Sequence, residues 1–304
     1  MRKWLKFILP LMILCLFIPF RNVNAAFGVD IGDTYNYECI AAERTFSLGA
    51  ETGTGEGFQI DGQHFDPGTI VTVEVIDLIS DSVHYNVSSG GYNFYQFSDL
   101  IGLLASLRFQ YIFYYAIATS MITDVNKWNQ TFVEQDPGLL LYDPFIEIGS
   151  STWEDIIEFG DGMVGYVSTI SNLVGLTGDA EHDQNDDEFL CQYHIYGAYN
   201  ETFTPYTSPY LPWEKDLLSI DHYYKYSYDK PNGVMLGSRM HGSTSGVVNG
   251  STMSISYDFH VEQVGYDLPT NLIVGGLNGF TILITFVSLF IPVLIVRMKR
   301  KSIN

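Results

Sequence analysis

The stretch from residue 222 to residue 262 constrains the fold more than any other, because two turn motifs there join three segments of alternating polarity. The segments are 222–229, 234–244 and 252–262. The turns fall at Pro231-Asn232-Gly233 and at Asn249-Gly250, and residues of these types favour short hairpin loops. The pattern therefore predicts a three-stranded antiparallel meander.

Each turn also fixes a pairing register, and the two registers agree with each other. A three-residue first loop, with Gly233 left-handed, and a two-residue second loop send the same residues of the middle strand to one face. A slip of one residue would invert every side chain, so this agreement supports the meander. The expected pairs are Tyr224 with Met240, Tyr226 with Ser238, Tyr228 with Leu236, Met240 with Phe259, Gly242 with Tyr257 and Thr244 with Ile255.

The opposite face of the meander carries ionisable side chains. They are Lys225, Arg239, His241, Asp258, His260 and Glu262. The two histidines could approach each other across the hairpin with carboxylates beside them. A solvated face with surface salt bridges is the favoured interpretation.

The rest of the body combines strand patterns near its start with helical patterns in its middle. Apolar residues alternate at 34–41, 69–79 and 83–87, which predicts strands. Ser151 and Glu154 fit a capping box that begins a helix, and the polar stretch 178–188 is expected to be a loop. We therefore expect an α+β, β-rich fold, in which helices from a central insertion at about 94–187 pack on a curved antiparallel sheet, followed by one C-terminal transmembrane helix.

The first 25 residues read as a secretory signal peptide. Arg2 and Lys6 belong to a basic start, and a short apolar run follows. Small residues near Ala25 suit a signal peptidase, so cleavage is expected there. An uncleaved anchor is the alternative.

The other end of the chain carries a second apolar segment. Residues 269–296 are expected to form a transmembrane helix, since no charged residue lies between Leu272 and Val296. The tail 297–304 is basic and therefore favours the cytoplasmic side. The expected topology is a single-pass protein of the plasma membrane, with an extracellular body at 26–268 and a cytoplasmic C-terminus.

The body is strongly acidic. Of the 15 lysines and arginines, four lie in the signal segment and four in the tail, so seven share the body with all 35 acidic residues. A field this negative repels nucleic acid and anionic lipid headgroups, so no nucleic-acid partner is expected.

An apolar stretch at 99–124 is also long enough to cross a membrane. Arg108 lies near its centre, and a second span would place the basic tail outside, against the usual charge bias. We expect this stretch to be a core element that packs over the sheet. The residues that could line a cavity there are Phe109, Ile112, Phe113 and Ile117.

Cysteines and glycosylation sequons fit an extracellular body. Cys39 and Cys191 are the two cysteines outside the signal segment, and a disulfide between them is the favoured interpretation. Two separate buried thiols are the alternative. The asparagines of the four Asn-x-Ser/Thr sequons are Asn86, Asn129, Asn200 and Asn249.

Motifs for chemistry are weak. Asp183, Asn185 and Asp187 could bind a loosely held Ca²⁺, but the spacing does not fit an EF-hand, and an ordinary solvated loop is favoured. No other cofactor is expected. The sequence contains no G-x-S-x-G, P-loop or H-E-x-x-H pattern, so we expect no catalytic residues and no enzyme activity.

Three stretches resemble parts of archaeal surface proteins. "IGDTYNYEC" (31–39) is similar to their opening strand, "YSYDKPNGVMLGSRMHG" (226–242) to a hairpin, and "EQVGYDLP" (262–269) to the stretch before their membrane span. With the apolar C-terminus, these stretches resemble the choice-of-anchor S type of archaeal membrane-anchored surface protein. The resemblance does not cover 90–215 and implies no activity. The hairpin is also similar to that of LolA-like half-barrels, a likeness of fold only.

These observations favour a cell-surface-anchored extracellular protein with a non-catalytic role in binding or envelope structure. Its expected partners are the membrane, through the C-terminal helix, and other surface proteins, glycans or lipid. A module that binds a hydrophobic ligand or lipid is the first alternative. An extracellular hydrolase that uses dispersed carboxylates is the second.

Overall fold

The computed structural model describes residues 27–79, 82–99, 143–149, 151–174, 176–198, 218–248 and 251–269. In these ranges the chain is β-rich, as predicted, with a large antiparallel sheet and the helix α4 (Thr152–Val174). The strands are β1 (Thr34–Leu48), β2 (Glu51–Glu56), β3 (Phe58–Ile60), β4 (Gln63–Phe65), β5 (Ile70–Ile79), β6 (Ser82–Ser89), β7 (Tyr92–Ser98), β8 (Leu176–Gln184), β9 (Glu188–Ala198), β10 (Leu218–Asp229), β11 (Val234–Val248) and β12 (Ser251–Gln263).

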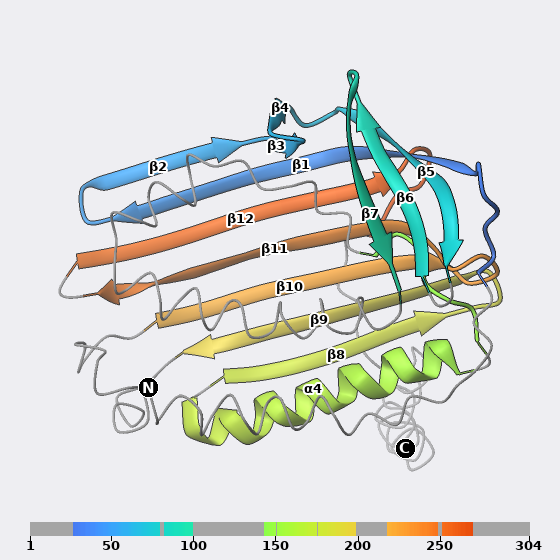
Figure 1. Ribbon diagram of the computed structural model, residues 1–304. Helices are drawn as coiled ribbons and strands as arrows, with labels where there is room; N and C mark the ends of the chain where they lie inside the picture. The colour runs from blue at the N-terminus through green and yellow to red at the C-terminus, as the bar shows by residue number, and fades with distance from the viewer. Residues whose placement is uncertain are drawn as a thin grey trace, which may run out of the picture.

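The large sheet joins strands from both ends of the body. Its order is β7-β6-β5-β1-β12-β11-β10-β9-β8, with β2 paired to β1, while β3 and β4 form a separate pair. β1 therefore pairs with β12, although the two strands lie more than 200 residues apart in sequence. Figure 1 shows β8 to β12 as long, nearly aligned strands, with β5, β6 and β7 crossing them steeply at one end.

The predicted meander is confirmed as β10, β11 and β12. Tyr224 pairs with Met240, and Met240 pairs with Phe259, as both turns require. Gly233 has a φ of 66°, the left-handed conformation expected of it. One predicted pair is wrong: Tyr228 pairs with Met235, because the register shifts after Ser227 and leaves Leu236 in a bulge. All other predicted pairs are present: Tyr226 with Ser238, Gly242 with Tyr257, and Thr244 with Ile255.

The predicted N-terminal strands are also confirmed, as parts of β1, β5 and β6. The alternating residues expected to share a face of β5 and β6 are fully buried or nearly so. They are Val71, Val73, Val75, Val83, Tyr85 and Val87. Alternation therefore identified the buried face of these strands correctly.

Contacts of Phe145 show that the sheet curls. A flat sheet would separate β6 from β11 by four strand spacings, about 19 Å. The Phe145 ring nevertheless lies 5.5 Å from that of Tyr85 on β6, while Phe145 also bridges to Val234 on β11. Ser98, at the end of β7, accepts a hydrogen bond from the Phe145 backbone N–H at 3.1 Å. The β6–β7 edge of the sheet therefore folds over toward β11 and meets it at Phe145, which is 1 % exposed.

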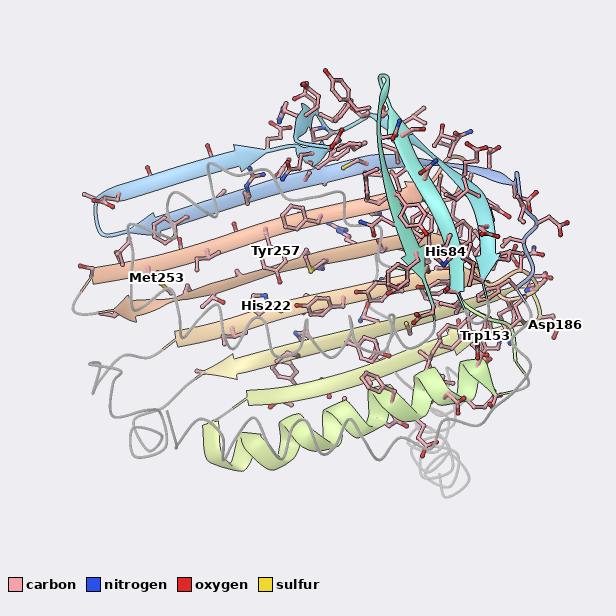
Figure 2. The ribbon with its side chains drawn as sticks, viewed as in Figure 1. His84, Trp153, Asp186, His222, Met253 and Tyr257 are labelled. Atoms are coloured by element: carbon pink, nitrogen blue, oxygen red, sulfur yellow. The ribbon has the colours of Figure 1, made fainter. Side chains whose placement is uncertain are left out.

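The described part of the central insertion contains helix α4 and, beside it, strand structure that the sequence did not predict. Helix α4 begins at Thr152, one residue after the predicted cap, and Ser151 donates to the Asp155 carboxylate at 3.0 Å. Trp153 packs against Phe189 with ring centroids 5.0 Å apart, and Figure 2 shows it at the helix end nearest the sheet. The stretch 178–188, expected to be a loop, instead forms most of the edge strand β8, a short turn and the start of β9.

The disulfide predicted between Cys39 and Cys191 is not formed, and both thiols are free and buried. They occupy one lateral row of the sheet, but three strands separate them. Across the strands, Cys191 pairs with Tyr226, Tyr226 with Ser238, Ser238 with Val261, and Val261 with Cys39. Four strand spacings amount to about 19 Å, whereas a disulfide needs Cα atoms within about 7 Å. Burial raises the pKa of each thiol to about 12, so both stay protonated at neutral pH.

Several predictions fall outside the described residues. These are the signal segment 1–25, the membrane segment 269–296 apart from Pro269, the tail 297–304, and the stretch 99–124 apart from Asp99. Among the residues that the structure describes, no helix combines the length and the apolar character that a membrane span requires.

Candidate functional site

The outer face of the meander is the face opposite the buried tyrosines of β10. Side chains alternate along a strand, so Lys225 and Ser227 lie on this face, while Tyr224, Tyr226 and Tyr228 lie on the inner one. Part of this face is buried, whereas the sequence favoured a solvated surface throughout; Arg239, His241 and Asp258 remain partly exposed. Lys225, His260 and Glu262 keep only 7 to 8 % of their surface exposed. Something therefore covers these charges.

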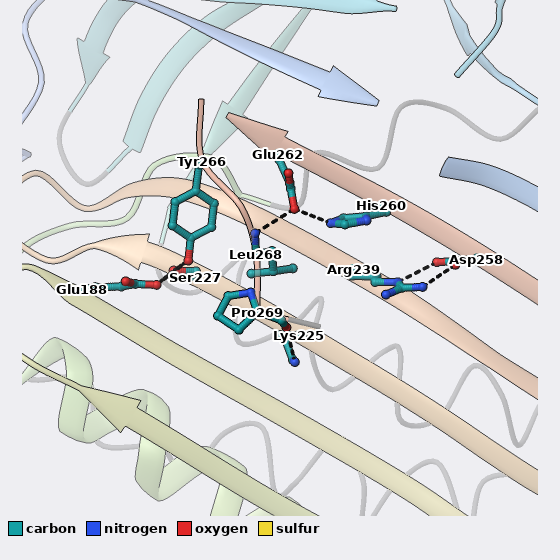
Figure 3. Close-up of polar contacts among 10 residues, drawn as sticks. All are labelled: Glu188, Lys225, Ser227, Arg239, Asp258, His260, Glu262, Tyr266, Leu268 and Pro269. Atoms are coloured by element: carbon teal, nitrogen blue, oxygen red, sulfur yellow. Dashed lines mark hydrogen bonds and ion pairs between the residues drawn. The ribbon is translucent and has the colours of Figure 1, made fainter. Parts of the chain in front are cut away.

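The cover is a short segment after β12, residues 264–269, which we call the C-terminal strap. The Val264 N–H donates to the Asn36 carbonyl at 2.8 Å, and Gly265 follows with a φ of 93°. A positive φ of this kind favours glycine and reverses the chain. The strap then runs back over the outer face of β11 and β10 (Figure 3), and Leu268 becomes 99 % buried.

The first contact of the strap joins three oxygen-bearing side chains. The Ser227 hydroxyl donates to Glu188 Oε1 at 2.6 Å, and the Tyr266 hydroxyl donates to the same oxygen. The two hydroxyl oxygens lie 2.9 Å apart. Burial, followed by the Glu188 carboxylate, raises the Tyr266 pKa above its usual value. Tyr266 is therefore a neutral donor that ties the strap to β9 and β10.

The second contact uses the Glu262 carboxylate. Its Oε1 accepts the backbone N–H of Leu268 at 2.8 Å and lies 2.8 Å from His260 Nε2. Burial lowers the His260 pKa, and the carboxylate opposes that effect. A carboxylate that accepts from a backbone N–H forms a charge-assisted hydrogen bond, which is stronger than a neutral one.

The third contact holds the end of the strap. Lys225 Nζ donates to the Pro269 carbonyl at 2.5 Å. Burial, followed by the nearby Arg239, lowers the Lys225 pKa. Arg239 itself forms a bidentate pair with Asp258, at 3.0 and 2.6 Å. Each charged group that the strap covers therefore has an opposite charge or a backbone group beside it, as buried charges require.

The two outer-face histidines do not meet. His260 lies beside Glu262, whereas His241 stacks on Tyr223 with ring centroids 4.7 Å apart and planes at 9°. Tyr223 in turn stacks on His194 at 3.9 Å. The histidines therefore belong to a hydrogen-bond contact with Glu262 and to a cross-strand stack, and do not combine into one site.

A second polar cluster lies on the inner face, around His222 (Figure 2). His222 Nδ1 lies 2.7 Å from the Tyr257 hydroxyl, and Nε2 lies 3.0 Å from that of Thr244. His222 leans over Gly242, where a β-carbon would come within 2.2 Å of Nδ1. Burial, followed by His241 and His194, lowers the His222 pKa to about 3. A neutral imidazole fixed by two hydroxyls serves structure better than proton transfer.

The predicted calcium ligands lie around the turn between β8 and β9. Asn185 Oδ1 accepts the backbone N–H groups of Asp187, at 2.7 Å, and Glu188, at 2.8 Å. This oxygen therefore stabilises the turn. In the part of the chain that the structure describes, no group of three or more His, Cys, Asp or Glu residues is placed to hold a metal ion.

The residues expected to line a cavity lie outside the described ranges. Of the predicted sequons, Asn86 lies on β6, while Asn129, Asn200 and Asn249 also fall outside. A cavity between α4 and the β8–β9 hairpin has a volume of about 10 Å³. That is room for about one water molecule, far below the size of a lipid site.

Sequence reasoning missed Glu188, Tyr266 and Leu268 as members of this site. The available signal was local: Tyr266 and Leu268 alternate directly after a strand and before the apolar C-terminus. Alternation beyond the last strand indicates that a segment still contacts the body.

Comparison with models of protein families, with curated proteins and with solved structures found no match to this chain. The site must therefore be interpreted from its own geometry.

Proposed function

We propose that the protein is displayed at the cell surface, held by a C-terminal membrane helix, and that its β-rich body has a non-catalytic role in binding or envelope structure. The strap is the observation that supports this most. It is the last described segment before the apolar stretch that begins at Leu272, and buried charge-assisted bonds attach it to the sheet. A C-terminal tail that led to no anchor would gain nothing from such an attachment to the sheet.

The strap suits the transmission of force and orientation between a body and an anchor. Its contacts reach three strands: Glu188 on β9, Lys225 on β10 and Glu262 on β12. A pull on the chain after Pro269 would therefore load the middle of the sheet, and not only the end of β12. The acidic body would stay solvated and clear of anionic headgroups.

The test compares the full chain with a chain that ends at Pro269, both expressed with the natural N-terminus. We expect the full chain in the membrane fraction and the shortened chain folded in the medium. The shortened chain keeps every strap contact, so its fold serves as the internal control. Retention of both chains with membranes, or of both inside the cell, would contradict the proposal.

A further inference from the structure

Three rings lie together on the outer face of the β6–β7 hairpin, and we call them the β7 aromatic patch: His84, Tyr95 and Phe97. Tyr95 is 56 % exposed and Phe97 is 60 % exposed. The His84 ring lies 5.5 Å from that of Tyr95 and 6.0 Å from that of Phe97. Clustered exposed rings on a body this acidic indicate a surface that binds something.

Asn86 lies within this patch. It is directly opposite Tyr95 in the β6–β7 register and two residues from His84 on the same strand. Side chains in directly opposite positions have β-carbons about 5 Å apart. In the ranges that the structure describes, the Asn86 side-chain amide has no hydrogen-bond partner, so its nitrogen is available.

The sequon Asn86-Val87-Ser88 also has a suitable orientation. Val87 is fully buried, so the alternation of the strand turns Asn86 and Ser88 together to the outer face. Both residues are partly exposed. Asn86 therefore combines the acceptor motif, exposure and a neighbouring aromatic surface.

Two carboxylates limit what can cover the patch. Glu74 is opposite Asn86, Asp77 is opposite His84, and both are exposed. An apolar protein partner would desolvate these charges at a cost, and anionic lipid would be repelled. A sugar ring suits both the aromatic rings and the carboxylates of this surface. Its C–H face can stack on the rings, while its hydroxyls donate hydrogen bonds to the carboxylates.

We propose that Asn86 is N-glycosylated and that its first sugar covers the β7 aromatic patch, stacked on Tyr95 and Phe97. In the transfer step Asn86 Nδ2 loses a proton and bonds to the anomeric carbon of the sugar. The phosphate of a lipid-linked sugar donor leaves with the electron pair of the broken bond. The inference rests on the proposed function, because this transfer acts on the translocated part of a chain.

Occupancy is tested first, by mass spectrometry of glycopeptides from the full chain expressed in a host that glycosylates asparagine. We expect sugar on Asn86, its loss in Ser88→Ala, and its retention in Ser88→Thr, which preserves the sequon. Sugar at Asn129, Asn200 or Asn249 with bare Asn86 would overturn this inference and leave the proposed function standing. If none of the four asparagines carried sugar, and if the body could be labelled only after cell lysis, both the inference and the proposed function would be overturned.

Coverage is tested next, by comparing the glycosylated protein with Asn86→Gln. We expect loss of the sugar to raise the unfolding equilibrium constant about three- to tenfold and to increase binding of a hydrophobic fluorescent dye. In a Tyr95→Thr/Phe97→Thr background the same change should have little effect on either quantity, because no rings remain to cover. Equal effects in the two backgrounds would overturn the inference.

Discussion

At the scale of single residues, His222 shows how the sheet accommodates a polar group inside its curve. The missing side chain of Gly242 leaves space for the imidazole, and two hydroxyls occupy both ring nitrogens. The imidazole of His222 suits this buried position only while it is neutral. Its folded pKa of about 3 lies well below the ordinary value of 6.5.

This pKa predicts a specific acid sensitivity. Between pH 6.5 and pH 3 the unfolded chain binds a proton at His222 that the folded chain does not, so stability falls as the pH falls through this window. The contribution of His222 should amount to about 2 kcal/mol between pH 7 and pH 5. Urea unfolding of the protein at the two pH values measures it.

The variant His222→Phe isolates this contribution. It should lose about 1–3 kcal/mol at pH 7, since the hydroxyls of Thr244 and Tyr257 each lose the hydrogen bond to His222, yet show a shallower loss of stability from pH 7 to pH 5. His182→Phe replaces an exposed histidine on β8 and is the matched control. An unchanged pH dependence in His222→Phe would show that the acid sensitivity arises elsewhere.

At the scale of elements, the C-terminal strap is the least conventional part of the fold, because it lies across a sheet without adding a strand to it. Its backbone is held by side chains of the sheet: Glu262 accepts from Leu268, and Lys225 donates to Pro269. The stability of the strap should therefore depend on these side chains individually.

Glu262→Ala tests this dependence. The variant removes the acceptor of the Leu268 N–H, so hydrogen exchange at that amide should accelerate by about tenfold or more, while the amides of β11 keep their protection. Glu38→Ala is the control, since Glu38 pairs directly with Glu262 in the sheet but is partly exposed and makes no contact with the strap among the bonds described above. Equal exchange at Leu268 in the parent and in Glu262→Ala would mean that Glu262 does not hold the strap.

Elements also show where sequence reasoning succeeded and failed. The meander was predictable because its turn residues and its alternation are local, and both registers had to agree. β8 was not, because Asp179, Glu181 and Asp183 made an edge strand resemble a loop. The alternation of Tyr266 and Leu268 indicates that the strap contacts the body, but its partners depend on a chain reversal at Gly265 and on strands far away in sequence, which a local pattern does not identify.

At the scale of the whole molecule, the large sheet curls so that its β6–β7 edge approaches the start of β11 at Phe145. The even number of cysteines in the body suggested a disulfide, but the number of cysteines does not tell how far apart they lie in the fold. The curl does not bring Cys39 and Cys191 together, since both thiols remain free. The general fold class was therefore predictable, whereas the distances between distant strands were not.

We propose for the whole molecule that the body lies outside the cell and the basic tail inside. Two epitope tags on the full chain report on which side of the membrane the body and the tail lie. One is inserted at Gly49, in the turn between β1 and β2, where the backbone is exposed and has a φ of 59°. The other follows Asn304.

The decisive measurement is antibody labelling of these two tags on intact and on permeabilised cells. We predict that the Gly49 tag is labelled on intact cells and that the Asn304 tag is labelled only after permeabilisation. Labelling of the Gly49 tag only after permeabilisation would contradict the account.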